Sequence, residues 1–204
     1  MKASLFDYGV GNLHSLGKAL EASGATVHIT SDAASALEAD CLILPGVGAF
    51  GPAAEAMSEG RNQLRAALAE GFPCLGICLG MQLLFEASAE APGDGLGVVA
   101  GRVERIDAPV VPHMGWNDVR PTRDVLFEGL TATPMYFANS YHCVPSDPNA
   151  AIGRSTYADT EMVTSIRVGN SWGVQFHPEK SSDAGRALLA NFIGAVRRLR
   201  GGAP

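Results

Sequence analysis

The chain has 204 residues and a formal net charge of −6 at pH 7, and 47% of its residues are hydrophobic. This length and composition exclude a disordered chain and predict one folded domain over residues 1–204. The negative charge argues against a nucleic-acid-binding protein, and no apolar run reaches the roughly 18 residues of a membrane span.

The first part of the chain alternates short apolar runs with helix-like segments. Strands are expected at residues 3–6, 25–29, Cys41–Leu44 and Cys74–Ile77, and helices at residues 12–23, 31–38, 61–70 and 79–87. Asn12 is the expected N-cap of the first helix. Such alternation predicts an α/β fold with a mostly parallel sheet flanked by helices.

After about residue 96 the pattern changes to successive short β segments. These are expected at residues 98–106, 116–120, 135–138, 151–155, 162–167 and 171–176, and Gly, Pro, Asn and Asp separate them. An antiparallel β patch in the C-terminal half, added to the parallel core, is the expected result. A final amphipathic helix is predicted over Ser182–Leu199.

The four cysteines, Cys41, Cys74, Cys78 and Cys143, lack the spacing of a small disulfide-linked domain. Asp7 also interrupts the first apolar run too early for the core of a signal peptide. Both observations favour a reducing cytoplasm as the location of the protein.

Cys78 lies in Gly76-Ile77-Cys78-Leu79-Gly80, between a strand-like run and a helix-like run. A nucleophile flanked in this way by glycines is typical of a tight strand-to-helix turn, where glycine tolerates the crowded backbone. The helix that follows would favour the reactive thiolate. The alternative is a buried thiol in an ordinary core turn.

A base and a group to orient it are available in the segment Gln175-Phe176-His177-Pro178-Glu179. Side chains two positions apart on an extended chain point the same way, so Glu179 can hold the imidazole of His177. His177 would then exchange protons with Cys78, as a nucleophile of this kind requires. Burying both polar groups without partners would be costly, which disfavours a purely structural role.

Chemistry at a carbonyl carbon also needs hydrogen-bond donors for the oxyanion. Pro45-Gly46-Val47-Gly48 forms a glycine-rich loop directly after a strand, and Leu79 follows the nucleophile. The backbone N–H groups of Val47, Gly48 and Leu79 are therefore the predicted oxyanion hole.

Taken together, the segments GICLGMQLLF (76–85), PGVG (45–48) and QFHPEKS (175–181) resemble the class I (triad) glutamine amidotransferases. DYGVGNLHSL (7–16), PHMGWNDV (112–119) and YFANSYHCVP (136–145) are similar to the glutaminase subunits of imidazole glycerol phosphate synthases. The resemblance covers nearly the whole chain. It implies a flavodoxin-like α/β fold and hydrolysis of L-glutamine to glutamate and ammonia through a γ-glutamyl thioester on Cys78, with no cofactor and no metal.

The same resemblance implies how the substrate and a partner bind. Gln82 would contact glutamine, and backbone groups of Gly46, Gly48, Ser140 and Tyr141 would hold its amino-acid end. A cyclase subunit with a (β/α)₈ barrel would form a heterodimer with this chain and use the ammonia to make imidazole glycerol phosphate and aminoimidazole carboxamide ribotide in histidine biosynthesis. The expected interface residues are Asn12, Trp116 and Lys180, although core packing would also explain Trp116 and N-capping explains Asn12.

Several alternatives stay open at this point. A triad glutaminase could serve another synthase, or a cysteine hydrolase of the same fold could act alone. Cys74, Cys78 and His177 could ligate zinc, although Cys-x₃-Cys is not the usual spacing of a zinc site. The fold could also have become a binding module without catalysis, which an intact Cys78, His177 and Glu179 set disfavours.

Overall fold

The computed structural model describes residues 1–9, 13–130 and 133–201, and the strands of these residues form one twelve-stranded sheet. The strands are β1 Lys2–Phe6, β2 Thr26–Thr30, β3 Cys41–Leu44, β4 Cys74–Ile77, β5 Phe85–Ser88, β6 Val99–Arg105, β7 His113–Pro121, β8 Thr133–Asn139, β9 Tyr141–Pro145, β10 Ala151–Tyr157, β11 Thr160–Val168 and β12 Ser171–Val174. The helices are α1 Leu13–Ala22, α2 Ala33–Leu37, α3 Phe50–Ala56, α4 Arg61–Ala69, α5 Leu79–Leu83 and α6 Ser182–Leu199, with 3₁₀ turns η1 Val125–Phe127, η2 Pro148–Ala150 and η3 Pro178–Lys180.

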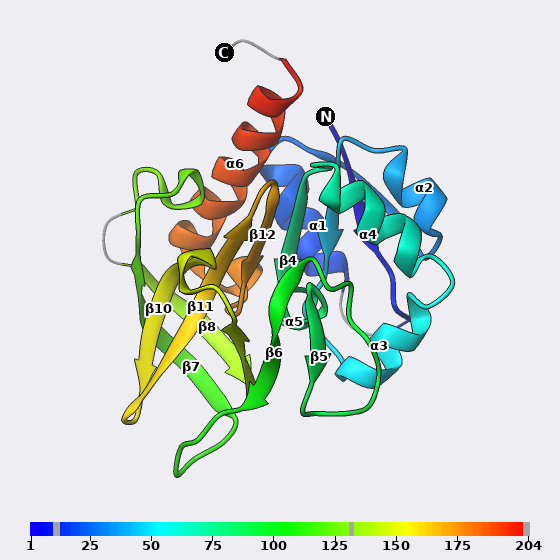
Figure 1. Cartoon of the computed structure of the whole chain (residues 1–204). Coiled ribbons are helices and arrows are strands. Elements are labelled where there is room, and N and C mark those ends of the chain that lie inside the picture. The colour runs from blue at the N-terminus through cyan, green and yellow to red at the C-terminus, as the bar shows by residue number, and fades with distance from the viewer. Residues whose placement is uncertain (10–12, 131–132, 202–204) are drawn as a thin grey trace.

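The sheet has a parallel half and an antiparallel half. Its main path runs β2-β1-β3-β4-β12-β11-β10-β7-β8, and β5, β6 and β9 join beside that path. The pairs from β2 to β12 are parallel, whereas β12 pairs β11, β11 pairs β10, and β10 pairs β7 in antiparallel fashion. In Figure 1 the antiparallel strands β7, β8, β10 and β11 lie on the side opposite α2, α3 and α4. The predicted α/β fold with an added antiparallel patch is confirmed.

Two apolar cores, one on each face of the sheet, explain why the central strands are unbroken runs of hydrophobic residues. On one face Leu5 of β1 packs with Leu20 of α1 and Phe192 of α6, and on the other Leu42 of β3 packs with Leu64 of α4. A strand covered on both faces has no solvent side, so every position in β3 and β4 is buried. Each fully buried large side chain contributes about 1.5–3 kcal/mol to folding.

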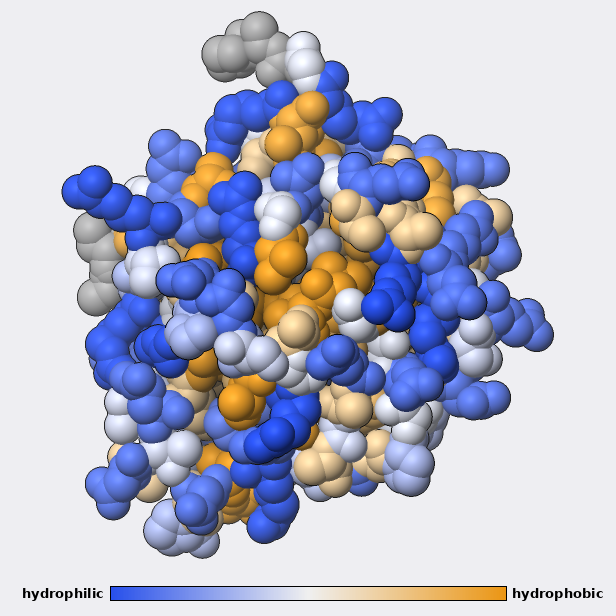
Figure 2. Space-filling view, viewed as in Figure 1, coloured by the Kyte–Doolittle hydropathy of each residue, from blue (hydrophilic) through white to orange (hydrophobic). Residues whose placement is uncertain are grey.

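The surface carries polar side chains over most of the face in Figure 2, with apolar side chains gathered near its middle. No helix within the described ranges is both long and apolar enough to cross a membrane. All four cysteines are buried and free of disulfides.

The predicted helix over residues 79–87 is wrong in its second half. Helix α5 ends at Leu83, and the chain continues as β5, where Phe85 pairs with Val99 of β6 in parallel register. The backbone thus gains strand partners from a distant segment, a tertiary effect that local propensity does not contain. Helix α3 and strand β9 had no predicted counterpart. The bounds of β3, β4 and α6 are as predicted, whereas ends of most other elements differ by one to three residues, as in β7, which begins at His113. Asn12 lies outside the described residues.

Candidate active site

The carboxyl ends of three neighbouring parallel strands bring the predicted site residues together. β4 lies between β3 and β12, and Ile77 at the end of β4 pairs with Val174 at the end of β12. Cys78 therefore follows β4 beside the segment that carries His177, and its N–H donates to the Val174 carbonyl at 2.6 Å. Parallel pairing thus joins two motifs far apart in the sequence, at the edge of the sheet where ligands bind in such folds.

Cys78 occupies a strained turn, as predicted. Its backbone has φ 49° and ψ −104°, in the region that non-glycine residues rarely adopt. A Cβ on Gly80 would lie 2.0 Å from the Leu44 carbonyl oxygen, and one on Gly76 would lie 2.5 Å from the Gly80 oxygen. Glycine is therefore required on both sides of the cysteine because the backbones of β3, β4 and α5 touch there.

His177 lies between a sulfur and a carboxylate. Its Nδ1 is 2.8 Å from Oε1 of Glu179, and since a carboxylate oxygen accepts, Nδ1 donates and leaves Nε2 for the Cys78 side. Burial disfavours the charged imidazole, but hydrogen bonds to Cys78 and Glu179, and then their negative charges, outweigh it and raise the pKa of His177 to about 10. The arrangement favours a protonated imidazole between the Cys78 sulfur and the Glu179 carboxyl group.

The backbone around His177 is fixed by the neighbouring strand. The His177 N–H donates to the Tyr136 carbonyl of β8 at 2.8 Å. The Ser181 hydroxyl donates to the His177 carbonyl at 2.6 Å and accepts from the Tyr136 N–H at 3.0 Å. The imidazole therefore sits on a segment that is hydrogen-bonded on both sides, which suits a group that must keep its orientation.

A pocket of about 280 Å³ opens over these groups. Its lining consists of Gly46, Val47, Gly48, Cys78, Leu79, Gln82, Glu90, Ala138, Asn139, Ser140, Tyr141, His177 and Lys180. The structure thus brings together the nucleophile, the base, the predicted oxyanion donors and every predicted substrate-binding residue. Glu179 lies behind His177, with 9% of its side chain exposed.

Three polar residues at this site were not predicted: Asn139, Glu90 and Gln175. Glu90 lines the pocket, and its Oε2 accepts from the N–H of Phe50 at 2.9 Å, at the start of α3. Gln175 is fully buried, with its Nε2 3.4 Å from the Cys78 sulfur. Gln175 could have been identified from the sequence, because it is a polar residue within the apolar run that precedes His177. No local sequence feature identifies Glu90 as a pocket residue.

Two of the predicted interface residues lie on the surface near the pocket. Trp116 on β7 is 54% exposed, so the core-packing alternative is wrong, and its ring meets Tyr136 edge-on with centroids 6.0 Å apart. The ammonium of Lys180 lies 5.8 Å from the centroid of the Tyr136 ring, and Lys180 also lines the pocket.

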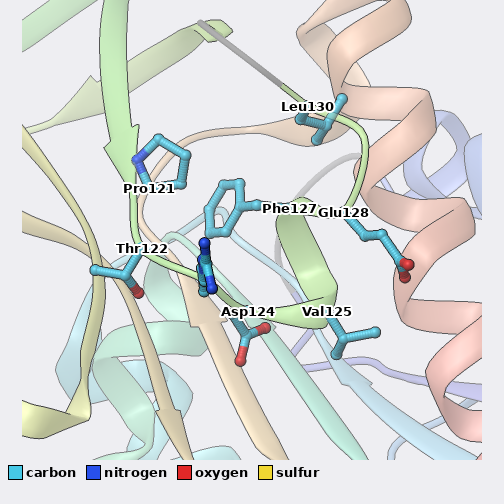
Figure 3. Close-up of a pocket in the computed structure, with 8 residues that line it drawn as sticks. Pro121, Thr122, Asp124, Val125, Phe127, Glu128 and Leu130 are labelled. Atoms are coloured by element: carbon cyan, nitrogen blue, oxygen red, sulfur yellow. The ribbon is translucent and has the colours of Figure 1, made fainter.

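A larger cavity, of about 640 Å³, lies elsewhere, around residues 121–130. Figure 3 shows Pro121, Phe127 and Leu130 around the same hollow as the Asp124 carboxylate. That carboxylate already accepts hydrogen bonds from the Leu126 N–H, the Trp172 indole and the Arg167 guanidinium. The buried Asp124 carboxylate of this cavity thus holds η1 against the sheet, and the smaller pocket remains the candidate active site.

The zinc alternative finds no support in the geometry. Cys74 is fully buried at the start of β4 and does not line the pocket that Cys78 and His177 share. Among the residues that the structure describes, no group of three or more His, Cys, Asp or Glu is arranged to hold a metal ion.

Comparison with known proteins agrees with the site. The profile of the family "Glutamine amidotransferase class-I" matches residues 4–195, and the chain belongs to that family. The chain is 44% identical over 201 residues to the imidazole glycerol phosphate synthase subunit HisH of Synechococcus elongatus, covering 95% of this chain and 93% of that protein. It is also 44% identical over 194 residues to the HisH subunit of Pyrococcus furiosus, covering 94% and 97%.

Solved structures share the fold at low sequence identity. PurLQS of Thermotoga maritima superposes with a TM-score of 0.76 at 19% identity, covering 96% of this chain and 98% of that one. A crystal structure of another glutamine amidotransferase gives a TM-score of 0.76 at 20% identity, covering 98% of both chains. These two show the architecture alone.

Proposed function

We propose that this chain is the glutaminase subunit of an imidazole glycerol phosphate synthase and hydrolyses L-glutamine to glutamate and ammonia. The observation that carries the proposal is the succession Cys78, His177 and Glu179, in which Cys78 and His177 line one pocket and Glu179 holds His177 from behind. The likeness to HisH subunits over almost the full chain supports the same assignment.

In the proposed reaction the Cys78 thiolate attacks the carboxamide carbon of glutamine. The backbone N–H groups of Val47, Gly48 and Leu79, which border the pocket, stabilise the oxyanion. His177 gives its proton to the departing nitrogen, the C–N bond breaks, and ammonia and a γ-glutamyl thioester result. Water then attacks the thioester while His177 takes its proton, and glutamate leaves as the Cys78 thiolate is restored.

The rest of the pocket suits the amino-acid end of glutamine. Gln82 and backbone groups of Gly46, Ser140 and Tyr141 supply hydrogen bonds for the substrate. We assign the Glu90 carboxylate to the substrate α-ammonium because, within the part of the lining that the structure describes, it is the one acidic side chain.

The proposed partner is a cyclase subunit with a (β/α)₈ barrel, which forms a heterodimer with this chain. Among the described residues of the pocket lining, Lys180 is the one permanent cation, which is too little charge for a phosphorylated acceptor, so the acceptor binds on another subunit. Lys180, which lines the pocket, and Trp116, which contacts the same Tyr136 ring as Lys180, are the proposed contacts, and Asn12 is the third. We also place the protein in the cytoplasm, as a single domain over residues 1–204; the single sheet that joins all the described strands supports the latter.

The reaction is tested by measuring glutamate release from the complex of this chain with the cyclase and its acceptor. The complex is used because a glutaminase that released ammonia without its partner would waste the ammonia, so we expect full activity only in the complex. Brief incubation with glutamine followed by acid quench and mass spectrometry should show a γ-glutamyl adduct on the Cys78 peptide. Glutamine turnover without any such adduct, or unaffected by Cys78→Ser, would contradict the proposed chemistry. Turnover that the cyclase does not stimulate would favour the stand-alone hydrolase.

A further inference from the structure

A buried chain of amide groups reaches the catalytic sulfur by a route separate from His177. The Gln82 Nε2 donates to the Tyr141 carbonyl and to Oε1 of Gln175, both at 3.3 Å. The Gln175 Nε2 in turn lies 3.4 Å from the Cys78 sulfur. Gln175 has no exposed surface and Gln82 is 5% exposed, so water does not compete for these bonds.

The direction of every bond in this chain follows from its far end. The Tyr141 carbonyl can only accept, so Gln82 must present its NH₂ group there. The second N–H of that group points to Gln175, whose side-chain carbonyl oxygen must therefore accept the hydrogen bond. The Gln175 NH₂ group is thereby turned toward Cys78, and the sulfur receives a hydrogen-bond donor.

We propose that Gln175 is a positioning residue, whose amide N–H holds the Cys78 sulfur toward the pocket and stabilises it as the anionic nucleophile. The inference rests on the proposed glutaminase chemistry, in which the thiolate attacks. A donor aimed at an anion makes a stronger bond than one aimed at a neutral thiol, so the contact favours the reactive form. It also links the nucleophile to Gln82, a residue that lines the substrate pocket.

Among the described residues, the titratable groups that interact with the sulfur are those of His177 and Cys143, in addition to the non-titrating Gln175 amide. His177 contacts the sulfur from the segment that follows β12 and is itself held by Glu179. From β9, the buried Cys143 thiol is close enough that the Cys78 charge adds to burial in raising the Cys143 pKa. Cys143 therefore stays a neutral thiol, whose S–H is a weaker donor than the Gln175 amide N–H.

The test is the pH dependence of Cys78 alkylation by iodoacetamide in the full-length chain, which needs neither glutamine nor a partner. Cys41, Cys74 and Cys143 are fully buried, and a Cys78→Ser protein measures any background. Gln175→Leu removes the donor, and we expect the midpoint of the alkylation profile to rise by about one pH unit, which is about tenfold slower alkylation on the rising limb.

A second variant protects the test against misfolding. Gln175→Glu keeps the shape and the acceptor for Gln82 but turns an acceptor toward the sulfur, so its midpoint should rise further than that of Gln175→Leu. Thr164→Val is the matched control. Thr164 is fully buried, and its carbonyl accepts from the Gln175 backbone N–H at 2.9 Å. The Thr164 hydroxyl has no hydrogen-bond partner, so its removal leaves the contacts of Gln175 intact. The profile of Thr164→Val should coincide with that of the wild type.

The inference is overturned if both Gln175 variants alkylate with the wild-type profile, or if Thr164→Val shifts the midpoint as far. Glutamate release by the wild-type complex is measured in parallel. A shifted profile in a protein without glutaminase activity would refute the proposed function alone, whereas an active enzyme with unshifted profiles would refute the role of Gln175 alone.

Discussion

The charge on Glu179 should govern how tightly His177 holds its proton. Glu179→Gln keeps the shape of the side chain and an oxygen for Nδ1, but removes the charge that faces the imidazole at 2.8 Å. A hydrogen bond to a charged group contributes about 1.5–3 kcal/mol, and one pH unit corresponds to about 1.4 kcal/mol. Since the pKa of His177 is raised to about 10 in the native protein, we expect the variant to titrate roughly one to two units lower.

The same shift predicts a pH-dependent loss of stability with a defined sign. The folded pKa of about 10 exceeds the unfolded value of 6.5, so this pairing stabilises the fold fully below pH 6.5. Its contribution falls as the pH rises through about 10, where the folded imidazole loses its proton. The free energy of unfolding should therefore differ between wild type and Glu179→Gln near pH 6.5 and converge near pH 10.

Nuclear magnetic resonance titration of the His177 ring and urea unfolding at the two pH values measure these effects. The kcat for glutamine should also fall by about a hundredfold or more in Glu179→Gln, because the imidazolium loses the negative charge that stabilises it. Glu161→Gln, at an exposed carboxylate on β11, is the control and should leave the His177 midpoint, the pH dependence of unfolding and kcat unchanged. An unchanged His177 midpoint in Glu179→Gln would refute the reasoning.

Three further predictions concern the turn, the substrate and the partner. Gly80→Ala would place a Cβ 2.0 Å from the Leu44 oxygen, and we expect urea unfolding to show about 3 kcal/mol less stability. The control is Gly194→Ala on α6, where the nearest contact of the new Cβ is 3.7 Å away, and this variant should gain about 0.5–1 kcal/mol. Equal effects of the two substitutions would contradict the packing argument. Glu90→Gln keeps an acceptor for α3 but loses the charge, so KM for glutamine should rise about tenfold with kcat nearly unchanged, and an unaltered KM would remove Glu90 from the substrate site. Trp116→Ala should weaken binding to the cyclase about thirtyfold by calorimetry while leaving stability unchanged, since the side chain is exposed; undiminished affinity would place the interface elsewhere.

Local patterns in the sequence predict the features that local physics determines. The apolar runs of β3 and β4 identify buried parallel strands because both faces are covered. The glycines around Cys78 mark a turn in which three backbone segments touch. His177 and Glu179 meet as predicted, but Glu179 lies in the 3₁₀ turn η3 and not on an extended chain, so the expected strand alternation is wrong as the reason for their contact.

Features that depend on distant partners could not be predicted in this way. β5 forms because β6 lies beside it, although the residues after Cys78 have the composition of a continuing helix. Gln175 reads as one polar residue in an apolar strand, and its contact with the sulfur exists only once β4 and β12 pair. Glu90 reaches the pocket from a loop after β5, so its place depends on the same unpredicted strand.

The proposed function requires that this chain cleaves the amide of glutamine and that a second subunit uses the released ammonia for synthesis. The direct measurement compares two nitrogen sources in the reconstituted complex of this chain, as wild type or Cys78→Ser, with the cyclase subunit. Cys78→Ser should abolish product formation from glutamine and leave product formation from added ammonium salts at the wild-type rate. Loss of both activities together, or continued use of glutamine without the thiol, would contradict the division of labour proposed for the two subunits.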